Sequence, residues 1–155
     1  MRYHIEFKHK KLLIALIVLF LVFIWGNSMM PASISKGVSG WLKDIINMLL
    51  SDAGGDKTLL GEEVLRKIAH AAEFAALGMV LMLLMEEGHK TKVAFLALCG
   101  LGAALIDETI QLFVDGRSGQ IKDIWIDLAG FVIGVLLVWL IIGIAQKRKM
   151  RHGCK

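Results

Sequence analysis

Four stretches of the chain are predominantly apolar, at about residues 12–29, 65–85, 93–114 and 124–145. Each is close to the roughly 20 residues of helix that a bilayer core requires. Within them the apolar residues form continuous runs and do not alternate with polar ones, which indicates lipid as the solvent. The pattern predicts an all-α fold: a polytopic membrane protein with a four-transmembrane-helix bundle, in a single domain over residues 1–155.

The segment between the first two spans has a different pattern. Its apolar residues recur at intervals of three and four, as on one face of a helix. We expect an additional amphipathic interfacial helix there, with its tryptophan at the lipid headgroups. Packing of the same apolar stripe against the bundle is an equally good interpretation. The stripe consists of Val38, Trp41, Leu42, Ile45, Ile46 and Leu49.

The first span also has the basic flank and apolar centre of a signal peptide. The residues after Trp25 form a poor cleavage site, Asn27-Ser28-Met29-Met30-Pro31. We therefore expect an uncleaved first helix.

Lysine and arginine predict the orientation of the four spans. Eleven of the 18 Lys and Arg residues fall on one side of the membrane if the chain crosses it four times. The positive-inside rule makes that side cytoplasmic. Both termini are then inside, residues 31–63 and 115–123 face out, and 146–155 form a basic cytoplasmic tail. The basic residues are Arg2, Lys8, Lys10, Lys11, Lys90, Lys92, Lys147, Arg148, Lys149, Arg151 and Lys155.

The formal net charge of +4 could suggest a nucleic-acid-binding protein. The basic residues cluster at the ends of the apolar runs, however, and no nucleic-acid motif interrupts those runs. We therefore expect no nucleic-acid partner. The two cysteines, Cys99 and Cys154, are too few for a disulfide framework or a metal knuckle.

The polar residues of the predicted spans gather at their outer ends. The cytoplasmic halves of the same helices contain almost nothing polar. Because a charge facing lipid is costly, such residues usually face the bundle interior or a cavity. We expect a polar pocket that opens to the outer leaflet. Its candidate residues are Asn27, Ser28, Arg66, Lys67, His70, Glu73, Asp107, Glu108, Gln111, Arg117, Ser118, Asp123 and Asp127.

Helical spacing places several of these residues on common faces. Arg66, His70 and Glu73 are separated by four and three residues and share a face, as do Asp107 and Gln111. The face that carries Asp123 and Asp127 continues into Gly130 and Gly134. This small-xxx-small pattern allows close helix approach, so we expect the acidic face of the fourth span to point into the bundle.

The residue types suggest two roles within the pocket. A histidine beside partly desolvated carboxylates suits acid–base chemistry, so the candidate catalytic residues are His70, Glu73, Asp107 and Glu108. Arginine and lysine can hold a phosphate or carboxylate, and an amide can orient a hydroxyl or water. The candidate substrate-binding residues are Ser28, Arg66, Lys67, Gln111, Arg117, Asp123 and Asp127.

Simpler interpretations exist for the same residues. The cations could form a purely structural ion-pair network with the acids, Arg66 or Lys67 could extend to the interface, and Asp123 could cap a helix. Asn27 and Ser28 could simply satisfy the end of the first helix. We expect no cofactor. A divalent cation is chemically compatible with His70, Glu73, Asp107, Glu108 and Asp123, but no compact signature such as His-Glu-x-x-His is present.

The ordered set of motifs resembles the VanZ-like membrane protein family over roughly residues 12–140. Asn27-Ser28 and Ser35 are similar to the family's segment after the first helix. Two departures are visible: Phe74 stands where the family often has Tyr, and Asp127 where many members carry Asn. An acid is therefore not essential at that position across the family. The other motifs are Leu65-Arg66-Lys67-Ile68-Ala69-His70 with Glu73-Phe74, Asp107-Glu108 with Gln111, Gly116-Arg117, Asp123 and Gly130.

The resemblance implies a small polytopic protein of the bacterial plasma membrane and cell envelope. The founding member lowers susceptibility to teicoplanin, a lipid-tailed glycopeptide antibiotic, but the family has no settled biochemical activity. We expect the pocket to recognise, and in an enzymatic form to process, an amphiphilic envelope molecule: an anionic lipid, a lipid-linked wall precursor or a lipoglycopeptide. The alternative is a non-catalytic membrane scaffold or regulator of an envelope enzyme. The expected partners are membrane lipids or a lipid-linked envelope molecule.

Overall fold

The computed structural model describes residues 7–31, 61–85, 90–117 and 119–152, together with Ile34, Asp44 and Met48. It contains the helices α1 (Phe7–Ser28), α3 (Glu62–Leu84), α4 (Lys90–Leu112) and α5 (Ile121–His152), and no strand in the described part of the chain. All four helices are long and apolar enough to cross a membrane. The predicted all-α, multi-pass fold is therefore confirmed.

The helices differ from the predicted spans mainly at their ends. α5 runs from Ile121 to His152, well beyond the expected 124–145, because hydropathy marks the lipid-crossing part while the backbone hydrogen bonds continue through the polar flanks. α4 ends at Leu112 and not at Val114. The amphipathic helix predicted over residues 38–49 lies outside the described residues, apart from Asp44 and Met48, and stays a prediction.

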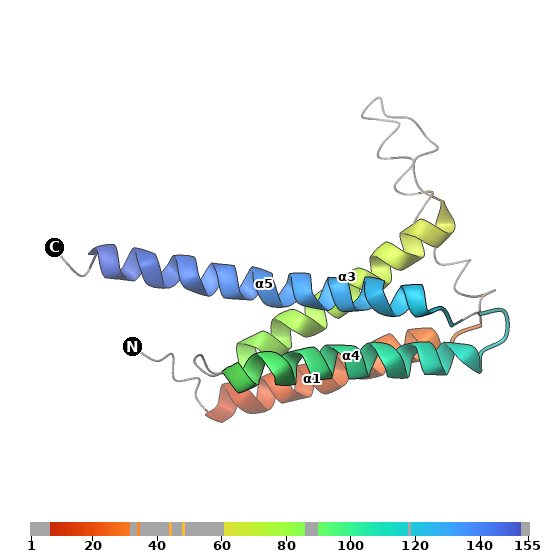
Figure 1. Cartoon of the computed structure of the whole chain (residues 1–155), viewed down its shortest axis with the longest axis horizontal. Helices are drawn as coiled ribbons and strands as arrows, with labels where there is room; N and C mark the ends of the chain where they lie inside the picture. The colour runs from red at the N-terminus through yellow and green to blue at the C-terminus, as the bar shows by residue number, and fades with distance from the viewer. Residues whose placement is uncertain are drawn as a thin grey trace.

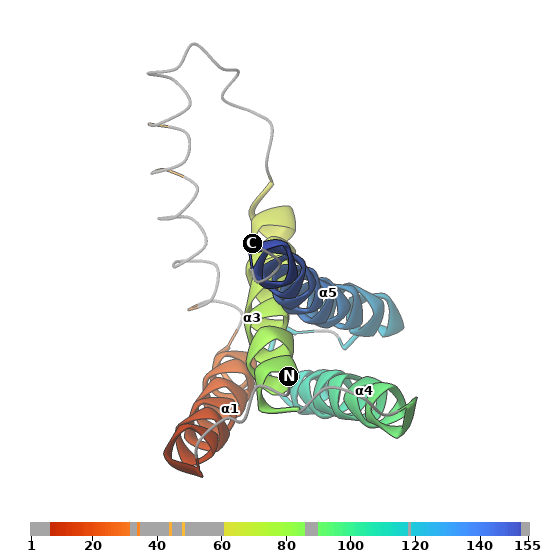
Figure 2. The ribbon, with the colours of Figure 1, turned by 90° about the vertical axis from the view of Figure 1, so that its left-hand side faces the viewer.

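The four helices alternate in direction, so α1 begins and α5 ends at the same end of the bundle (Figure 1). The α4–α5 loop and the start of α3 lie at the opposite end. Turning the molecule shows α3 in the centre, with α1, α4 and α5 around it (Figure 2). The most extensive packing is between α3 and α5, and α1 also packs against α3 and α4.

Small residues determine how closely α3 and α5 approach. A Cβ atom added to Gly130 or Gly134 would overlap the backbone carbonyls of Ala71 or Ala75. Gly78 of α3 meets the backbone of Phe131 in the same way. The small-xxx-small pattern therefore allows the backbones of the two helices to touch, and the face expected to point into the bundle does so.

The bundle has a narrow apolar core and an apolar outer surface. Large side chains such as Leu98 and Trp139 remain more than half exposed at 68% and 62%. Such a surface would aggregate in water but is suited to lipid. The buried core cluster consists of Ile24, Phe74, Leu77, Leu81, Leu96, Ala103, Ala104 and Phe131.

Candidate functional site

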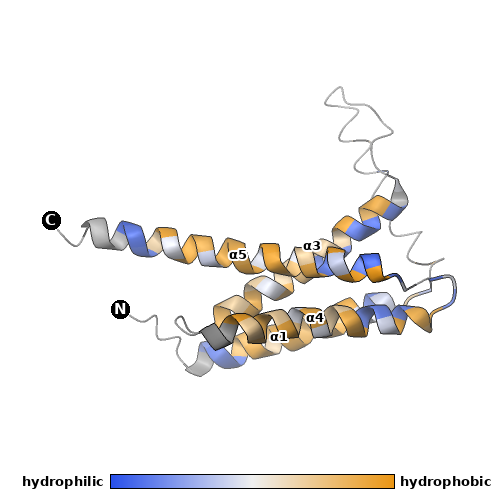
Figure 3. Ribbon diagram, viewed as in Figure 1, coloured by the Kyte–Doolittle hydropathy of each residue, from blue (hydrophilic) through white to orange (hydrophobic). Residues whose placement is uncertain are grey.

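Hydrophilic residues of α3, α4 and α5 lie toward the end of the bundle that carries the α4–α5 loop, and a second hydrophilic group lies at the start of α1 and the end of α5 (Figure 3). All four helices contribute to the cluster at the loop end, and the structure describes every predicted site residue except Ser118. Its most buried polar members are Ser28 of α1, Asp107 and Glu108 of α4, and Asp127 of α5. The cluster is separated from the other end of the bundle by the apolar core.

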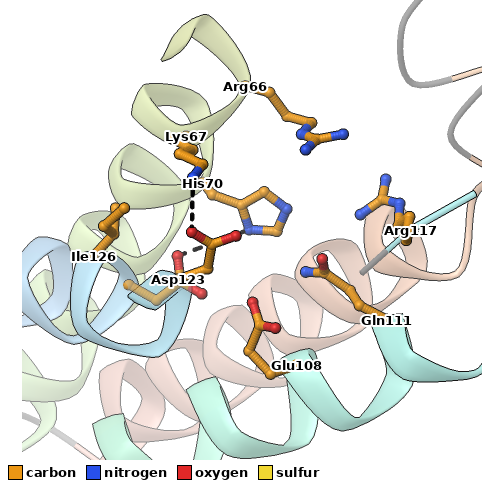
Figure 4. Close-up of a pocket in the computed structure, with 9 residues that line it drawn as sticks. Arg66, Lys67, His70, Glu108, Gln111, Arg117, Asp123 and Ile126 are labelled. Atoms are coloured by element: carbon orange, nitrogen blue, oxygen red, sulfur yellow. Dashed lines mark ion pairs between the residues drawn. The ribbon is translucent and has the colours of Figure 1, made fainter. Parts of the chain in front are cut away.

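A small pocket lies within this cluster (Figure 4). Its volume of about 20 Å³ holds roughly one water-sized species. Ser28, Glu73 and Asp107 lie beside the pocket and not in its lining. A ligand larger than a water molecule would have to place most of its atoms at the mouth. The lining residues are Arg66, Lys67, His70, Glu108, Gln111, Arg117, Asp123, Ile126 and Asp127.

The outer end of α1 is tied to α3 and α4 by amide side chains. Asn27 Nδ2 donates a hydrogen bond to Glu73 Oε1 at 2.9 Å. Gln111 Nε2 lies 3.3 Å from Ser28 Oγ and 2.8 Å from Asp107 Oδ2, as a donor to both. Glu73 therefore faces α1, outside the pocket, while Gln111 fixes the orientation of the Asp107 carboxylate.

The adjacent residues Asp107 and Glu108 are both buried, at 0% and 5% exposure, but their side chains contact different residues. Asp107 faces Gln111 and His70. Glu108 Oε2 accepts a hydrogen bond of 2.8 Å from the backbone N–H of Gln120. A Cβ atom on Gly119 would crowd Leu112 and the Glu108 carbonyl, so glycine lets the loop approach the end of α4.

Lys67 forms the principal ion pair of the site. Its Nζ lies 3.0 Å from Asp123 Oδ1 and 3.2 Å from Glu63 Oε1. Asp123 lies inside the first turn of α5, where a carboxylate is favoured by the helix dipole. It is therefore not the capping residue, and the alternative that assigned it only a cap is wrong.

Arg66 and Arg117 both line the pocket, and Figure 4 shows their guanidinium groups on the same side of it. One Arg117 terminal nitrogen donates to the backbone oxygen of Asn27 at 2.9 Å, but Arg117 Nε has no hydrogen-bond partner in the described chain. Among the described residues, neither arginine has a carboxylate within ion-pair distance. The structural ion-pair network of the simpler interpretation is thus formed by Lys67 and not by the arginines.

The short α4–α5 loop presents Arg117 to the pocket. Gly116 adopts a φ of 75°, a conformation that L side chains rarely adopt, and the chain turns there with Arg117 N donating to Val114 O at 3.1 Å. Burial, followed by the positive charge of Arg66, lowers the pKa of Arg117 from its usual value. An anion beside the two guanidinium groups would offset both effects.

The family model described as VanZ/LLP1 matches residues 12–142. The chain belongs to this family. No curated protein and no solved structure matches it. The matched range includes every site residue described above, so this is a VanZ-like envelope protein whose polar cluster lies within the family domain.

In this VanZ-like chain the structure separates the residues whose side chains are chemically compatible with a divalent cation. Glu73, Glu108 and Asp123 are directed to Asn27, Gln120 and Lys67, respectively. The carboxylates nearest to His70 are those of Asp107 and Asp127. Sequence spacing could not show that these three residues lie together. It relates residues on one helix, whereas His70, Asp107 and Asp127 lie on three different helices.

Asn27 has a larger part in the site than the sequence suggested. Its side chain binds Glu73 and its backbone oxygen accepts from Arg117, so it connects α3 and the α4–α5 loop to α1. The sequence feature that pointed to Asn27 was an amide side chain at the outer end of the first apolar span. The same feature was compatible with a residue that only forms hydrogen bonds to the backbone at the helix end.

Proposed function

We propose that this VanZ-like protein recognises the anionic headgroup of an amphiphilic envelope molecule at the outer leaflet of the bacterial plasma membrane. The ligand class is a phosphate- or carboxylate-bearing amphiphile: an anionic lipid, a lipid-linked wall precursor or a lipoglycopeptide such as teicoplanin. The observation that carries the proposal is the pair Arg66 and Arg117, which line one pocket without a carboxylate partner among the described residues.

Two like charges beside one another repel, and an anion placed between them offsets this repulsion. Acids are available nearby, since Glu108 and Asp123 line the same pocket, yet they bond to other groups. A guanidinium group matches phosphate and carboxylate oxygens with two parallel hydrogen bonds. The arrangement therefore favours an external anion at the mouth of the pocket.

The size of the pocket and the outer surface of the bundle suggest how an amphiphile would bind. The charged group would rest on the arginines, because the interior holds only about one water-sized species. The apolar chains would lie along exposed helix surfaces, to which Ile68 and Ile121 contribute at 51% and 77% exposure. Where the ligand is also processed, His70 is the candidate proton donor or acceptor, with Asp107, Glu108 and Glu73 as its acidic neighbours.

A headgroup comparison on the purified protein tests this function. We expect a lysolipid with a phosphate monoester headgroup to bind at least about tenfold more tightly than an uncharged monoacylglycerol of equal chain length, since each charge-assisted hydrogen bond contributes about 1.5–3 kcal/mol. Isothermal titration in an uncharged detergent measures the ratio. Equal affinities would exclude anion recognition and favour the scaffold alternative.

We further propose that both termini are cytoplasmic and that the site faces outward, because the basic residues concentrate at the opposite end. A membrane-impermeant maleimide applied to intact cells tests the orientation. We expect an Asp115→Cys variant to be labelled and the native Cys154 to be labelled only after permeabilisation. Labelling of Cys154 in intact cells would show that the C-terminus lies outside and that the proposed orientation is wrong.

A further inference from the structure

His70, Asp107 and Asp127 meet beside the pocket at distances that no direct bond explains. His70 Nδ1 lies 3.9 Å from Asp107 Oδ2 and 4.0 Å from Asp127 Oδ1, which is too far for a hydrogen bond. The three ligand atoms all lie within 4.8 Å of one another. We propose that they bind a divalent transition-metal cation of the Zn²⁺ or Mn²⁺ class.

The separations suit a cation placed between the three atoms. A point equidistant from atoms 3.9, 4.0 and at most 4.8 Å apart lies at most about 2.5 Å from each of them. Zn²⁺ bonds to imidazole nitrogen and carboxylate oxygen are about 2.0–2.2 Å long. Each side chain would have to move only a few tenths of an ångström. The imidazole donor favours a transition metal over Mg²⁺ or Ca²⁺.

Unpartnered buried atoms point to the same ligand. Asp107 is fully buried, and its Oδ1 has no hydrogen-bond partner in the described chain. His70 Nδ1 also lacks a hydrogen-bond partner there, and the His70 side chain is only 15% exposed. A buried polar atom without a partner is costly. A cation bound by His70 Nδ1 and by the Asp107 carboxylate would give both side chains a partner.

The charge of the cluster also favours a cation. Its acids outnumber its permanently charged bases by three when all of them are ionised, so a divalent cation would offset most of the excess negative charge. The acids are Glu63, Glu73, Asp107, Glu108, Asp123 and Asp127, and the bases are Arg66, Lys67 and Arg117.

The surroundings fit a metal site that is open on one side. Gln111 donates to Asp107 Oδ2 at 2.8 Å, the kind of outer contact that orients a ligating carboxylate. The pocket lined by His70 and Asp127 leaves space for about one water molecule as a further ligand. The metal proposal is independent of the proposed function, since the cation would bind to His70, Asp107 and Asp127 without an amphiphile present.

Metal binding to the full-length protein in detergent tests the site. After mild chelation, we expect wild-type protein to bind one equivalent of Zn²⁺ or Mn²⁺ from the chloride salt in equilibrium dialysis. His70→Ala should weaken binding at least about 100-fold, because loss of an outer contact alone costs about 10- to 100-fold. Asp107→Asn and Asp127→Asn should each weaken it less, about tenfold, since an amide oxygen can still bind a cation.

Asp115→Asn is the matched control, because it removes one carboxylate from the exposed α4–α5 loop outside the pocket lining. It should bind metal as the wild type does. Visible absorption of the Co²⁺-loaded wild type checks nitrogen ligation without relying on a buried variant that fails to fold. The proposal is overturned if the wild type retains no stoichiometric metal or if Asp115→Asn loses as much as Asp107→Asn. If the wild type distinguishes anionic from uncharged lipids but binds no metal, the metal site is excluded while the proposed function is retained.

Discussion

Replacing Gly134 with valine is expected to separate α5 from α3 and to leave little folded protein. The new Cβ would overlap the Ala75 carbonyl, and a backbone atom in the middle of a helix cannot rotate away as a side chain can. Overpacking of a core costs about 1–3 kcal/mol, and occasionally more; a backbone clash belongs at the upper end. We expect a lower midpoint of thermal unfolding in detergent and a low yield of monodisperse protein.

Gly143→Val is the control for this variant. Gly143 lies on the same helix and has no atom within 4 Å of an added Cβ. It should fold as the wild type does, because the added methyl groups would contact only lipid or detergent. Equal unfolding midpoints for the two variants would contradict the close α3–α5 contact on which the placement of Asp127 depends.

The double variant Arg66→Gln, Arg117→Gln is expected to lose the anion selectivity of the pocket. Two charge-assisted contacts, each contributing about 1.5–3 kcal/mol, correspond to at least about a 100-fold loss of affinity for a phosphate-bearing lysolipid. Affinity for the uncharged monoacylglycerol should change little, since it depends on the apolar chain. Titration of both lipids measures the two affinities separately.

Lys122→Gln is the matched control for the arginine variant. Lys122 is exposed at the start of α5 and does not line the pocket, although it carries a positive charge at the same end of the bundle. A general attraction of anions to this end would be weakened by Lys122→Gln as well. A specific site would be weakened only in the arginine variant, provided that its thermal unfolding remains cooperative.

Much of this fold could be predicted from the sequence because the bilayer imposes a simple rule. Four runs of about 20 apolar residues can be satisfied only by helices, and Gly130 with Gly134 marks the face of close packing. Helix ends were less predictable. Ile121 and the residues after Ala145 are helical although hydropathy places them at or beyond the ends of the span.

The candidate site was predictable as a set of residues but not as a set of partners. Helical spacing relates Arg66 to His70 on one helix, yet it cannot relate either to α1 or α5. Only the folded arrangement shows that Asn27 binds Glu73 and that Asp127 lies near His70. Lys67 pairs with Asp123, whereas Arg66 has no carboxylate partner in the described part of the chain; this contrast also depends on contacts between helices.

Recognition of an anionic amphiphile is tested most directly by the lipids that the protein retains through purification from its own membrane. Mass spectrometry would compare wild type, Lys122→Gln and the Arg66→Gln, Arg117→Gln variant. We predict that the first two are enriched in one class of anionic amphiphile relative to the bulk membrane, and that the arginine variant is not. Bulk lipid composition in all three samples would contradict specific recognition by this pocket.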